Sequence, residues 1–590
     1  MSCSGRYQVS DRDVLSREWR PQIYRRCTDV LWLLIFFLFW SGMMFIAGYA
    51  LTVGSAERLI FGYDSYGNVC GRRNVAIKGA SLSGQDMTNR KLVFFLNACN
   101  VDSTNHTINS VSICVSRCPE DELKELEDLQ YFAQNNGSYL CVYSLNVSEY
   151  IVHSKAAQLC PALPVPPSQA FPLFNRCVPQ RPDCYSRFLS ILINIVNESD
   201  NFQRIIGSIM VSKESIVGLC FLLKIGFVYT DKENTKALLG FSITATIVSV
   251  ILILLTLVMW KRISLTIQLF RIASKILGSV PLLMLQPLWT FIILAFFWMY
   301  WVTVLLSLGT AGKAYVTADN QVEYWPLSGI RYMWWYHLIG LIWTSEFLLA
   351  CQQMTIAGAV VCCYFNRDKK HPPSNPILTA ISKLFNYHLG TVAKGSFIIT
   401  LVRIPRIVLL YIHDCLKGKE GACARCLVNC CMCCLWCLEK CLRYLNQNAY
   451  TATAINGTDF CTSARDAFAI IVNNALNVAA VNCFGDFLLL LGKVFVMCFT
   501  VFGGLVVFNY HRDLNIWVIP LLIVCFFAYL VAHCFLSLFE MVVDILLMCY
   551  AIDLTTNDGS AEKPYFMDKQ LMVSVKNNDL NITLCIFLSS

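Results

Sequence analysis

The chain has 590 residues, of which 56% are hydrophobic and only 15% are charged, with a formal net charge of +8. This composition excludes an ordinary soluble globular protein and an intrinsically disordered one, because both carry far more charge relative to apolar residues. The basic excess flanks apolar segments, where it orients membrane helices and meets anionic lipid, so it does not indicate nucleic-acid binding.

Apolar runs long enough to cross a bilayer, about 20 residues each, recur along the chain. They predict spanning helices at Val30–Val53, Ala237–Trp260, Ile276–Leu308, Met333–Val361, Phe484–Tyr510 and Ile516–Ile552. Gly395–Ile412 is a weaker candidate, a broken or interfacial helix, because Arg403, Pro405 and Arg406 interrupt it. We therefore expect an all-α polytopic membrane protein.

The first apolar run is too long for a signal peptide, and no Ala-x-Ala cleavage pattern follows it. The segment before it is rich in arginine and therefore predicts a cytosolic N-terminus by the positive-inside rule. The arginines concerned are Arg6, Arg12, Arg17, Arg20, Arg25 and Arg26.

The segment after the first helix has the marks of an oxidising, extracytosolic compartment, since it combines an even number of cysteines with N-x-Ser/Thr acceptors. Its eight cysteines are Cys70, Cys99, Cys114, Cys118, Cys141, Cys160, Cys177 and Cys184, and we expect four disulfides of unassigned connectivity. The predicted glycosylation sites are Asn105, Asn136, Asn146 and Asn197. Together they predict a glycosylated, disulfide-rich extracellular loop domain.

A second cysteine cluster runs from Cys415 to Cys441. Zinc is one interpretation, because Cys423/Cys426 and Cys434/Cys437 have C-x-x-C spacing. The run lacks histidine and alternates with apolar residues in a basic context, which favours an amphipathic, S-acylated segment at the cytosolic membrane surface. We expect no cofactor and no bound metal.

One face of the Met333–Val361 run combines aromatic rings with a carboxylate. At 100° per residue, Trp335, Tyr336, Trp343, Glu346 and Gln353 fall within a stripe about 100° wide. A carboxylate in the middle of a bilayer costs several kcal/mol unless it faces a partner or water. The stripe therefore indicates either a site for an organic cation, since ring faces attract ammonium groups, or tryptophan packing with Glu346 paired to a buried cation.

A second candidate lies in the Ile276–Leu308 run, at the sequence Gln286-Pro287-Leu288-Trp289. Pro287 has no amide hydrogen, so it predicts an interrupted helix with carbonyl groups freed beside Gln286. Transporters build substrate sites at such interruptions, and Trp289 would form one aromatic wall. The alternative is a structural kink beside a packing tryptophan.

Four stretches are distinctive together: FGYDSYGNVCG (61–71), FFLNACN (94–100), YHLGTVAKGSFIITLVRIPR (387–406) and NQNAYTATAINGTDFCTSARDAF (446–468). They resemble the choline transporter-like family over most of the chain. The resemblance implies a transporter with ten helices, a glycosylated loop after the first, and both termini in the cytosol. It also implies carriage of choline and ethanolamine across the plasma membrane, with a pool at the mitochondrial outer membrane, in sodium-independent exchange with protons.

The chain departs from the family pattern after VSKESIVGLCFLLKIGFVY (211–229), where the rest of the second helix and the third helix are missing. Lys261, Arg262, Arg271 and Lys275 follow Ala237–Trp260 and predict a cytosolic end for that helix. A spanning 212–229 segment would invert every later helix, so we expect it not to cross. About eight spans then remain. The C-terminal KNNDLNITLCIFLSS is also unlike the charged tail that the family implies.

The resulting organisation has eight segments. They are a cytosolic N-terminus (1–29), the first transmembrane helix (30–54), the extracellular domain (55–211), a truncated helix remnant (212–236), transmembrane helices with the candidate choline site (237–363), cytosolic, interfacial and membrane segments that include Cys-rich 415–441 (364–483), the C-terminal transmembrane helices (484–552) and a cytosolic tail (553–590).

Choline has a quaternary nitrogen without hydrogens, so aromatic faces should hold its head group. Gln286, Gln352 or Gln353 would bind its hydroxyl, and Glu346 would balance the charge or carry the exchanged proton. Asp486 and Lys493, on one helix face, predict an internal ion pair, and Glu540 and Asp544 predict a gate or a solvated helix end. Lys394, Arg403 and Arg406 predict either contact with lipid phosphate or a mobile gate.

Catalysis has little support, because the chain contains no H-E-x-x-H, G-x-S-x-G or P-loop motif, and its eight histidines are scattered. The leading hypothesis is a non-enzymatic membrane transporter whose partners are choline, ethanolamine, protons and membrane lipid. The alternative is a truncated, non-transporting membrane glycoprotein that acts through its extracellular domain.

Overall fold

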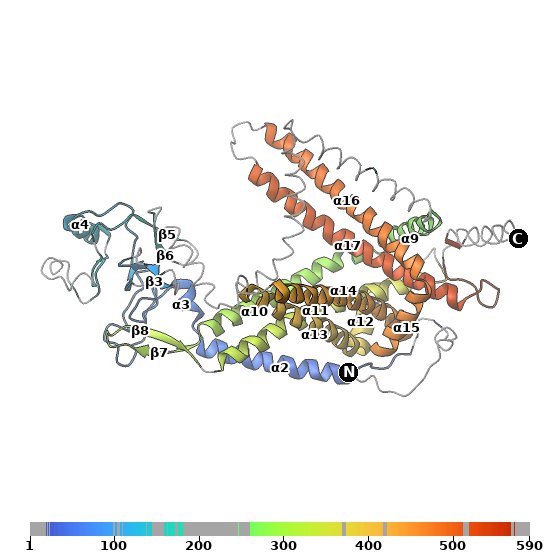
Figure 1. Ribbon diagram of the computed structural model, residues 1–590, viewed down its shortest axis with the longest axis horizontal. Coiled ribbons are helices and arrows are strands. Elements are labelled where there is room, and N and C mark those ends of the chain that lie inside the picture. The colour runs from blue at the N-terminus through green and yellow to red at the C-terminus, as the bar shows by residue number, and fades with distance from the viewer. Residues whose placement is uncertain are drawn as a thin grey trace. The chain divides into compact units, whose positions relative to one another are not determined.

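The computed structural model describes residues 24–97, 260–327, 329–368, 373–416, 422–510 and 518–567, most of 101–180, and residues 19, 22, 246, 571 and 572 (Figure 1). Several predicted features lie outside these residues: Cys99, Cys184, Asn105, Asn146, Asn197, segment 212–236, nearly all of Ala237–Trp260 and the tail beyond 572.

Two compact units make up the chain. The helical unit contains Met1–Phe39, Ser215–Phe296 and Ile342–Ser590, and the mixed unit contains Trp40–Glu214 and Phe297–Leu341. Three helices contribute to both units, because the division falls inside them: α2 (Val30–Val53), α10 (Gln286–Gly309) and α11 (Ile330–Tyr364).

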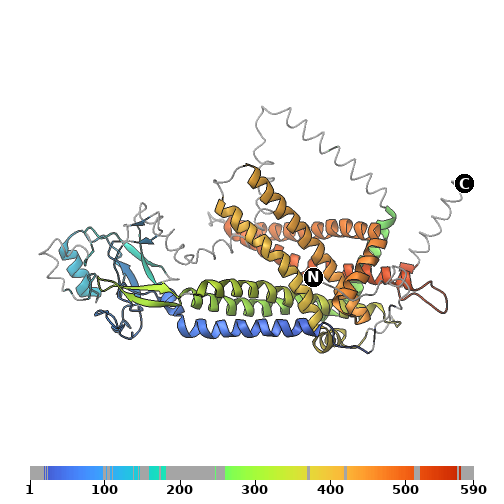
Figure 2. The ribbon, with the colours of Figure 1, turned by 60° about the horizontal axis from the view of Figure 1, so that its bottom comes forward.

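The rest of the helical unit consists of helices in its described part. They are α9 (Trp260–Ser279), the 3₁₀ helix η4 (Pro281–Leu285), α12 (Pro376–Lys383), the π-helix η5 (Leu384–His388), α13 (Leu389–Leu416), α14 (Ala422–Asn456), α15 (Phe460–Asn473), α16 (Ala475–Tyr510) and α17 (Val518–Thr556). α13 packs on α14 and α14 on α15, while α16 and α17 lie side by side with α9 against both (Figures 1 and 2).

Six helical stretches in the described residues are long and apolar enough to cross a membrane: Val30–Val53, Pro281–Gly309, Ile330–Tyr364, Pro376–His413, Ala475–Gly504 and Ile523–Thr556. These stretches confirm the polytopic helical class. Gly395–Ile412, expected to be broken or interfacial, is part of the continuous helix α13, which contains Pro405.

The helix interruption expected at Pro287 occurs earlier, so this detail of the prediction was wrong. Helix α9 ends at Ser279, Pro281 begins the 3₁₀ helix, and α10 starts at Gln286. Pro287 then lies in the first turn of α10, which follows the 3₁₀ helix directly, since the Gln286 N–H donates to the Leu283 carbonyl. The Gln286 carbonyl accepts a hydrogen bond from the Thr290 hydroxyl at 3.1 Å.

The mixed unit contains a four-stranded sheet in the order β4-β1-β6-β5, with the β1–β6 pair parallel and the other pairs antiparallel. The strands are β1 (Leu92–Phe95), β4 (Ser112–Val115), β5 (Ser168–Phe171) and β6 (Arg176–Pro179). The described part of this unit also contains two short helices, α3 (Ala56–Phe61) and α4 (Leu126–Asn136), and two hairpins, β2–β3 (Val101–Asp102, Thr107–Ile108) and β7–β8 (Gly312–Val316, Val322–Pro326).

Three disulfides join the predicted extracellular cysteines: Cys70–Cys114, Cys118–Cys177 and Cys141–Cys160. They confirm the disulfide-rich loop, and they supply the pairing of six of its eight cysteines; Cys99 and Cys184, needed for the fourth predicted disulfide, lie outside the described residues. All six sulfurs are buried within or beside the apolar clusters of the mixed unit. Small apolar cores of this kind gain stability from cross-links that restrict the unfolded chain.

A single buried carboxylate organises the FGYDSYGNVCG segment. Asp64 is fully buried and accepts hydrogen bonds from the backbone N–H of Tyr66 (3.0 Å) and Asn68 (2.7 Å), the Asn68 amide (2.9 Å) and the Tyr143 hydroxyl (2.7 Å). Gly67 sits between them at φ +85°, a conformation that suits glycine. This segment, one of the four that carry the resemblance, therefore stabilises the fold of the mixed unit.

Burial also shifts the ionisation of this cluster. Burial raises the pKa of Asp64, against the hydrogen bonds from Asn68 and Tyr143, which lower it. Burial and the nearby Asp64 charge raise the pKa of Tyr66 to about 12. The same two causes raise the pKa of Tyr143, which stays a hydrogen-bond donor to Asp64 at physiological pH.

Asp64→Ala leaves four buried donors without their acceptor. At about 1–3 kcal/mol for each unsatisfied group, we expect the unfolding free energy to fall by about 3 kcal/mol or more. The measurements are the melting temperature of the full chain in detergent and its amount at the cell surface. Asp121→Ala, at an exposed carboxylate of the same unit, is the control and should behave as wild type. An equal loss in both variants would contradict the role of Asp64.

Candidate functional site

The carboxylate at the middle of α11 is paired with two arginines. Glu346 is 5% exposed. Arg443 of α14 donates two hydrogen bonds to it, from Nη1 to Oε2 at 3.2 Å and from Nη2 to Oε1 at 3.1 Å. Arg403 of α13 also donates to Oε1. In this structure Glu346 is therefore paired with two arginines, each about a third exposed.

The ion pairs continue beyond Glu346. Arg443 also donates to Glu439 at 3.1 Å, one turn earlier in α14, and Arg406 of α13 donates to the same carboxylate at 2.5 Å. This charged network contains three guanidiniums and two carboxylates and joins α11, α13 and α14. Arg403 and Arg406 therefore contact carboxylates, whereas the sequence predicted lipid phosphate or a mobile gate.

Trp343, one turn before Glu346, is enclosed by aromatic rings. It is 2% exposed, and its indole N–H donates to the Ala393 carbonyl at 3.3 Å. Its ring centroid lies 5.1 Å from those of Phe36 and Phe39 on α2 and 5.0 Å from that of Phe397 on α13. We call these four rings the aromatic cluster. Trp343 packs against each of the three phenylalanine rings at distances that leave no room for a ligand between them.

The other predicted residues of the α11 stripe are distributed between the two units. Gln353 lies half-buried in the helical unit. Trp335, 42% exposed, and Tyr336 belong to the mixed unit, where the Tyr336 hydroxyl lies so close to Gly42 of α2 that a larger side chain there would collide with it. Of the stripe, the structure therefore brings Trp343 and Glu346 into one charged and aromatic environment.

The remaining predicted pair lies at the start of α10. Gln286 is half-buried at the junction of η4 and α10, and Trp289 is 60% exposed, as a side chain facing lipid would be. Their assignment to a cation site stays a prediction.

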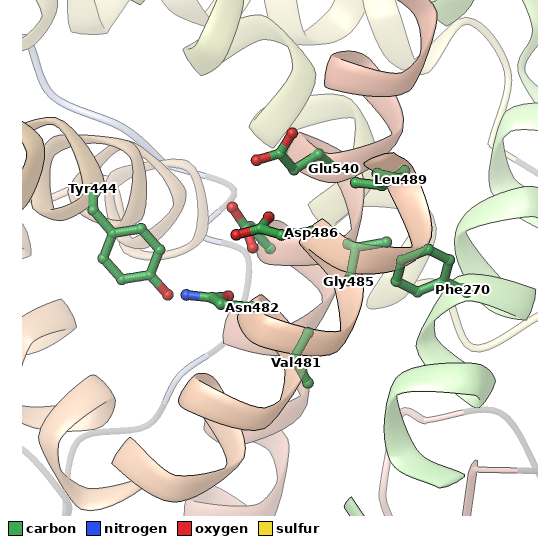
Figure 3. Close-up of a pocket in the computed structure, with 10 residues that line it drawn as sticks. Phe270, Tyr444, Val481, Asn482, Gly485, Asp486, Leu489 and Glu540 are labelled. Carbon is green, nitrogen blue, oxygen red and sulfur yellow. The ribbon is translucent and has the colours of Figure 1, made fainter. Parts of the chain in front are cut away.

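An acidic cavity between α14, α16 and α17 was not predicted. It has a volume of about 160 Å³, and its lining includes three carboxylates, Asp486, Glu540 and Asp544, together with the rings of Phe270 and Tyr444. Figure 3 shows the Tyr444 hydroxyl directed toward Asn482 and the carboxyl groups of Asp486 and Glu540 facing the same space. The amide of Gln447 donates to Asp544 at 3.2 Å. Seen in the sequence, the three acids belong to two separate helices, so no spacing rule could group them.

A second unpredicted hub lies at the start of α2. Asp29 accepts hydrogen bonds from Lys394 Nζ (2.8 Å), the Thr391 hydroxyl (3.1 Å) and the backbone N–H of Phe460 (2.8 Å). The carbonyl of Asp29 lies against Gly390, where any larger residue would collide with it. Lys394, like the two arginines, is therefore engaged by a carboxylate, and the hub fastens α2 to α13 and α15.

The Cys-rich segment is helical from Ala422 onward, and seven of its cysteines are exposed and reduced: Cys426, Cys430, Cys431, Cys433, Cys434, Cys437 and Cys441. A helix places such residues in rows along its surface rather than around a tetrahedral ion. Among the described residues, no group of three or more potential ligands could hold a metal.

Comparisons with known proteins extend along the whole chain. The profile of a family described as "Plasma-membrane choline transporter" matches residues 243–555. Choline transporter-like protein 3 of Homo sapiens is 55% identical over 632 aligned positions, which cover 98% of this chain and 96% of that protein. Choline transporter-like protein 3 of Bos taurus is 54% identical, with coverages of 98% and 97%, and choline transporter-like protein 1 of Xenopus laevis is 50% identical, with 98% and 96%.

These alignments also bear on the missing segment. The alignment with the human relative runs over 632 positions and this chain has 590 residues, so at least 42 of those positions have no residue here. Where these positions fall along the chain is not part of that count, so the loss of helical sequence after residue 229 stays a prediction.

Arg443→Met removes the residue shared by both carboxylates of the charged network. Each carboxylate keeps one arginine, and a third of Arg443 is exposed, so we expect a loss of about 2 kcal/mol, below the ~3–5 kcal/mol for breaking a fully buried pair. The melting temperature of the full chain in detergent measures it. Lys440→Met, at an exposed cation of the same helix, is the control, and an unchanged melting temperature in Arg443→Met, or an equal fall in both variants, would refute the network's role.

Proposed function

The chain belongs to the choline transporter-like family, and from this premise we propose that it carries choline across the plasma membrane. The observation that carries the proposal is the match with named choline transporter-like proteins over 98% of the chain. The six apolar helices and the buried charges between them suit a path for a polar cation through a membrane.

The finer features belong to the same proposal. Ethanolamine is the second substrate, transport is sodium-independent and exchanges the cation for protons, and both termini lie in the cytosol. The six N-terminal arginines and the disulfides on the other side of α2 support this orientation, because disulfides persist in oxidising compartments. The proposal also includes glycosylation at the four predicted asparagines and a pool of the protein at the mitochondrial outer membrane. The proposed role of the protein is transport rather than catalysis.

We place the choline head group at the aromatic cluster beside Glu346. Ring faces attract a quaternary ammonium, and a carboxylate one turn away supplies the opposite charge. Because the four rings now touch and Glu346 is bound by Arg403 and Arg443, choline would enter only when the rings separate and an arginine releases the carboxylate. Trp335, Tyr336, Gln353, Gln286 and Trp289 are proposed to line the route.

The acidic cavity suits the proton side of the exchange. Glu346 already accepts hydrogen bonds from two cations, whereas the donor to Asp544 is the neutral amide of Gln447. Three carboxylates that face one cavity repel one another when all are ionised, so binding a proton relieves that repulsion. We propose Asp544, with Glu540, as the proton carrier.

The alternative function is a non-transporting membrane glycoprotein acting through its disulfide-linked extracellular domain. The 42 or more alignment positions without a residue here leave room for it, because the resemblance implies that membrane-helix sequence is missing after residue 229. Uptake of radiolabelled choline by cells that lack their own choline carriers separates the two functions. Saturable uptake rejects the alternative, and the absence of choline uptake at normal surface expression rejects transport.

Trp343→Ala and Glu346→Gln test the proposed choline site. A desolvated cation–ring contact contributes about 2 kcal/mol, so we expect choline uptake at low concentration to fall about tenfold or more while surface expression stays normal. Trp436→Ala, at an exposed tryptophan of α14, is the matched control and should transport as wild type. Wild-type uptake in both test variants would remove this helix face from the site.

Asp544→Asn tests the proton step. We expect the variant to lose the stimulation of choline uptake by an imposed proton gradient but to keep choline exchange without a gradient, because an amide cannot take up the proton. Uptake by vesicles with and without a pH difference measures both. Asp319→Asn, at an exposed carboxylate of the mixed unit, is the control. Retention of full stimulation in Asp544→Asn would contradict the assignment.

A further inference from the structure

The β7–β8 hairpin presents two exposed aromatic rings outside the membrane helices. Tyr315 is 65% exposed and Trp325 is 61% exposed, and their ring centroids lie 5.8 Å apart with 31° between the ring planes. Burying a large aromatic side chain is favourable, so a pair of rings that stays exposed on an ordered hairpin indicates a ligand-binding surface.

Strand pairing fixes which side chains share this face. The hairpin pairs Lys313 with Trp325 and Tyr315 with Glu323. Side chains alternate between the faces of a strand, so these four residues lie on one face and Ala314, Val322 and Tyr324 on the other. Glu323 also accepts a hydrogen bond from the Trp325 indole N–H at 3.3 Å, which holds the ring beside the carboxylate.

The opposite face of the hairpin anchors it. Val322 is 5% exposed, and its N–H donates to the Ser65 carbonyl at 2.8 Å. The Arg58 guanidinium lies 3.7 Å from the centre of the Tyr324 ring. Both contacts join the hairpin to the segment just before Cys70, so the aromatic pair belongs to the same unit as the disulfides. These contacts hold the hairpin in place without a ligand.

The hairpin is also the outer connection between two spanning helices. β7 begins at Gly312, directly after α10 ends at Gly309, and β8 ends at Pro326, shortly before α11 begins at Ile330 (Figure 2). Trp325 and Lys313 are at the base of the hairpin, nearest the helix ends, and Tyr315 and Glu323 are one pair further out. A group bound here is held within a few residues of the start of α11.

We propose that Tyr315, Trp325 and Glu323 form an extracellular site for a trimethylammonium group. The methyl groups of the trimethylammonium contact both rings. An aromatic ring attracts a cation that lies within about 6 Å of the ring centre, and Glu323 supplies the opposite charge. Lys313, across from Trp325, competes for the same rings and weakens the site. The choice of ligand rests on the proposed function, and the chemistry is shared by free choline and the head group of phosphatidylcholine.

The test is photo-crosslinking of the purified full chain in nanodiscs free of choline lipids. The probe is a membrane-impermeant aryl azide that carries a trimethylammonium group, and mass spectrometry of peptides locates the label. We expect labelling of the 312–326 hairpin that choline suppresses and that 3,3-dimethylbutanol, the uncharged isostere of choline, does not. The same chain in nanodiscs that contain phosphatidylcholine is the second arm: suppression by choline in the first arm assigns the free solute, and a label that choline does not suppress overturns a site for free choline, whatever the second arm shows.

Variants make the result specific. Tyr315→Ala and Trp325→Ala should each weaken probe binding about three- to fivefold, as expected for an exposed cation–ring contact, and Glu323→Gln about twofold. Lys313→Gln should strengthen it about twofold. Tyr131→Ala, at a 70% exposed tyrosine of α4, is the control and should change nothing.

Labelling of the hairpin no stronger than that of the Tyr131 peptide, or equal suppression by choline and its uncharged isostere, overturns the proposal. The measurement does not depend on transport. A chain that fails to take up choline but keeps the suppressible label would lose the proposed transport function and retain this site.

Discussion

The structure depends most on the pairing of charges inside an apolar helical unit. A single ionised side chain there is costly, so Glu346 requires partners, and they come from two other helices, α13 and α14. Arg443 binds Glu346 with two hydrogen bonds and Glu439 with a third, so the position of α14 relative to α11 is fixed by charge as well as by apolar packing.

The segments that carried the family resemblance owe much of their composition to hubs of this kind. FGYDSYGNVCG surrounds the buried carboxylate of Asp64, and YHLGTVAKGSFIITLVRIPR supplies Lys394 to Asp29 and Arg403 to Glu346. NQNAYTATAINGTDF supplies the Phe460 N–H to Asp29. Polar groups in a low-dielectric interior tolerate few substitutions, because each loss leaves its partner unpaired. These segments therefore identify the family through its scaffold.

Two electrostatic environments coexist in the helical unit. The charged network and the aromatic cluster are closely packed, with Trp343 2% exposed and Glu346 5% exposed, whereas three carboxylates surround an open cavity between α14, α16 and α17. The proposed exchange of a cation for a proton requires both a site that excludes water when it is closed and a group that can change its protonation. In this proposal the two environments supply these two requirements at different places in the unit, and both involve α14.

The sequence alone determined the membrane class, most of the helix positions and the group of cysteines that forms disulfides, because each follows from residues that are neighbours in the chain. It also identified Glu346 as the residue that needs a partner. Only the tertiary structure decided which partner it has, which cysteines pair, that the helix interruption is at Pro281, and that Asp486, Glu540 and Asp544 face one cavity. The physical reason is that periodicity records one helix's own faces, whereas ion pairs, disulfides and cavities join residues whose separation in the chain, 57 positions for Glu346 and Arg403, carries no periodic signal.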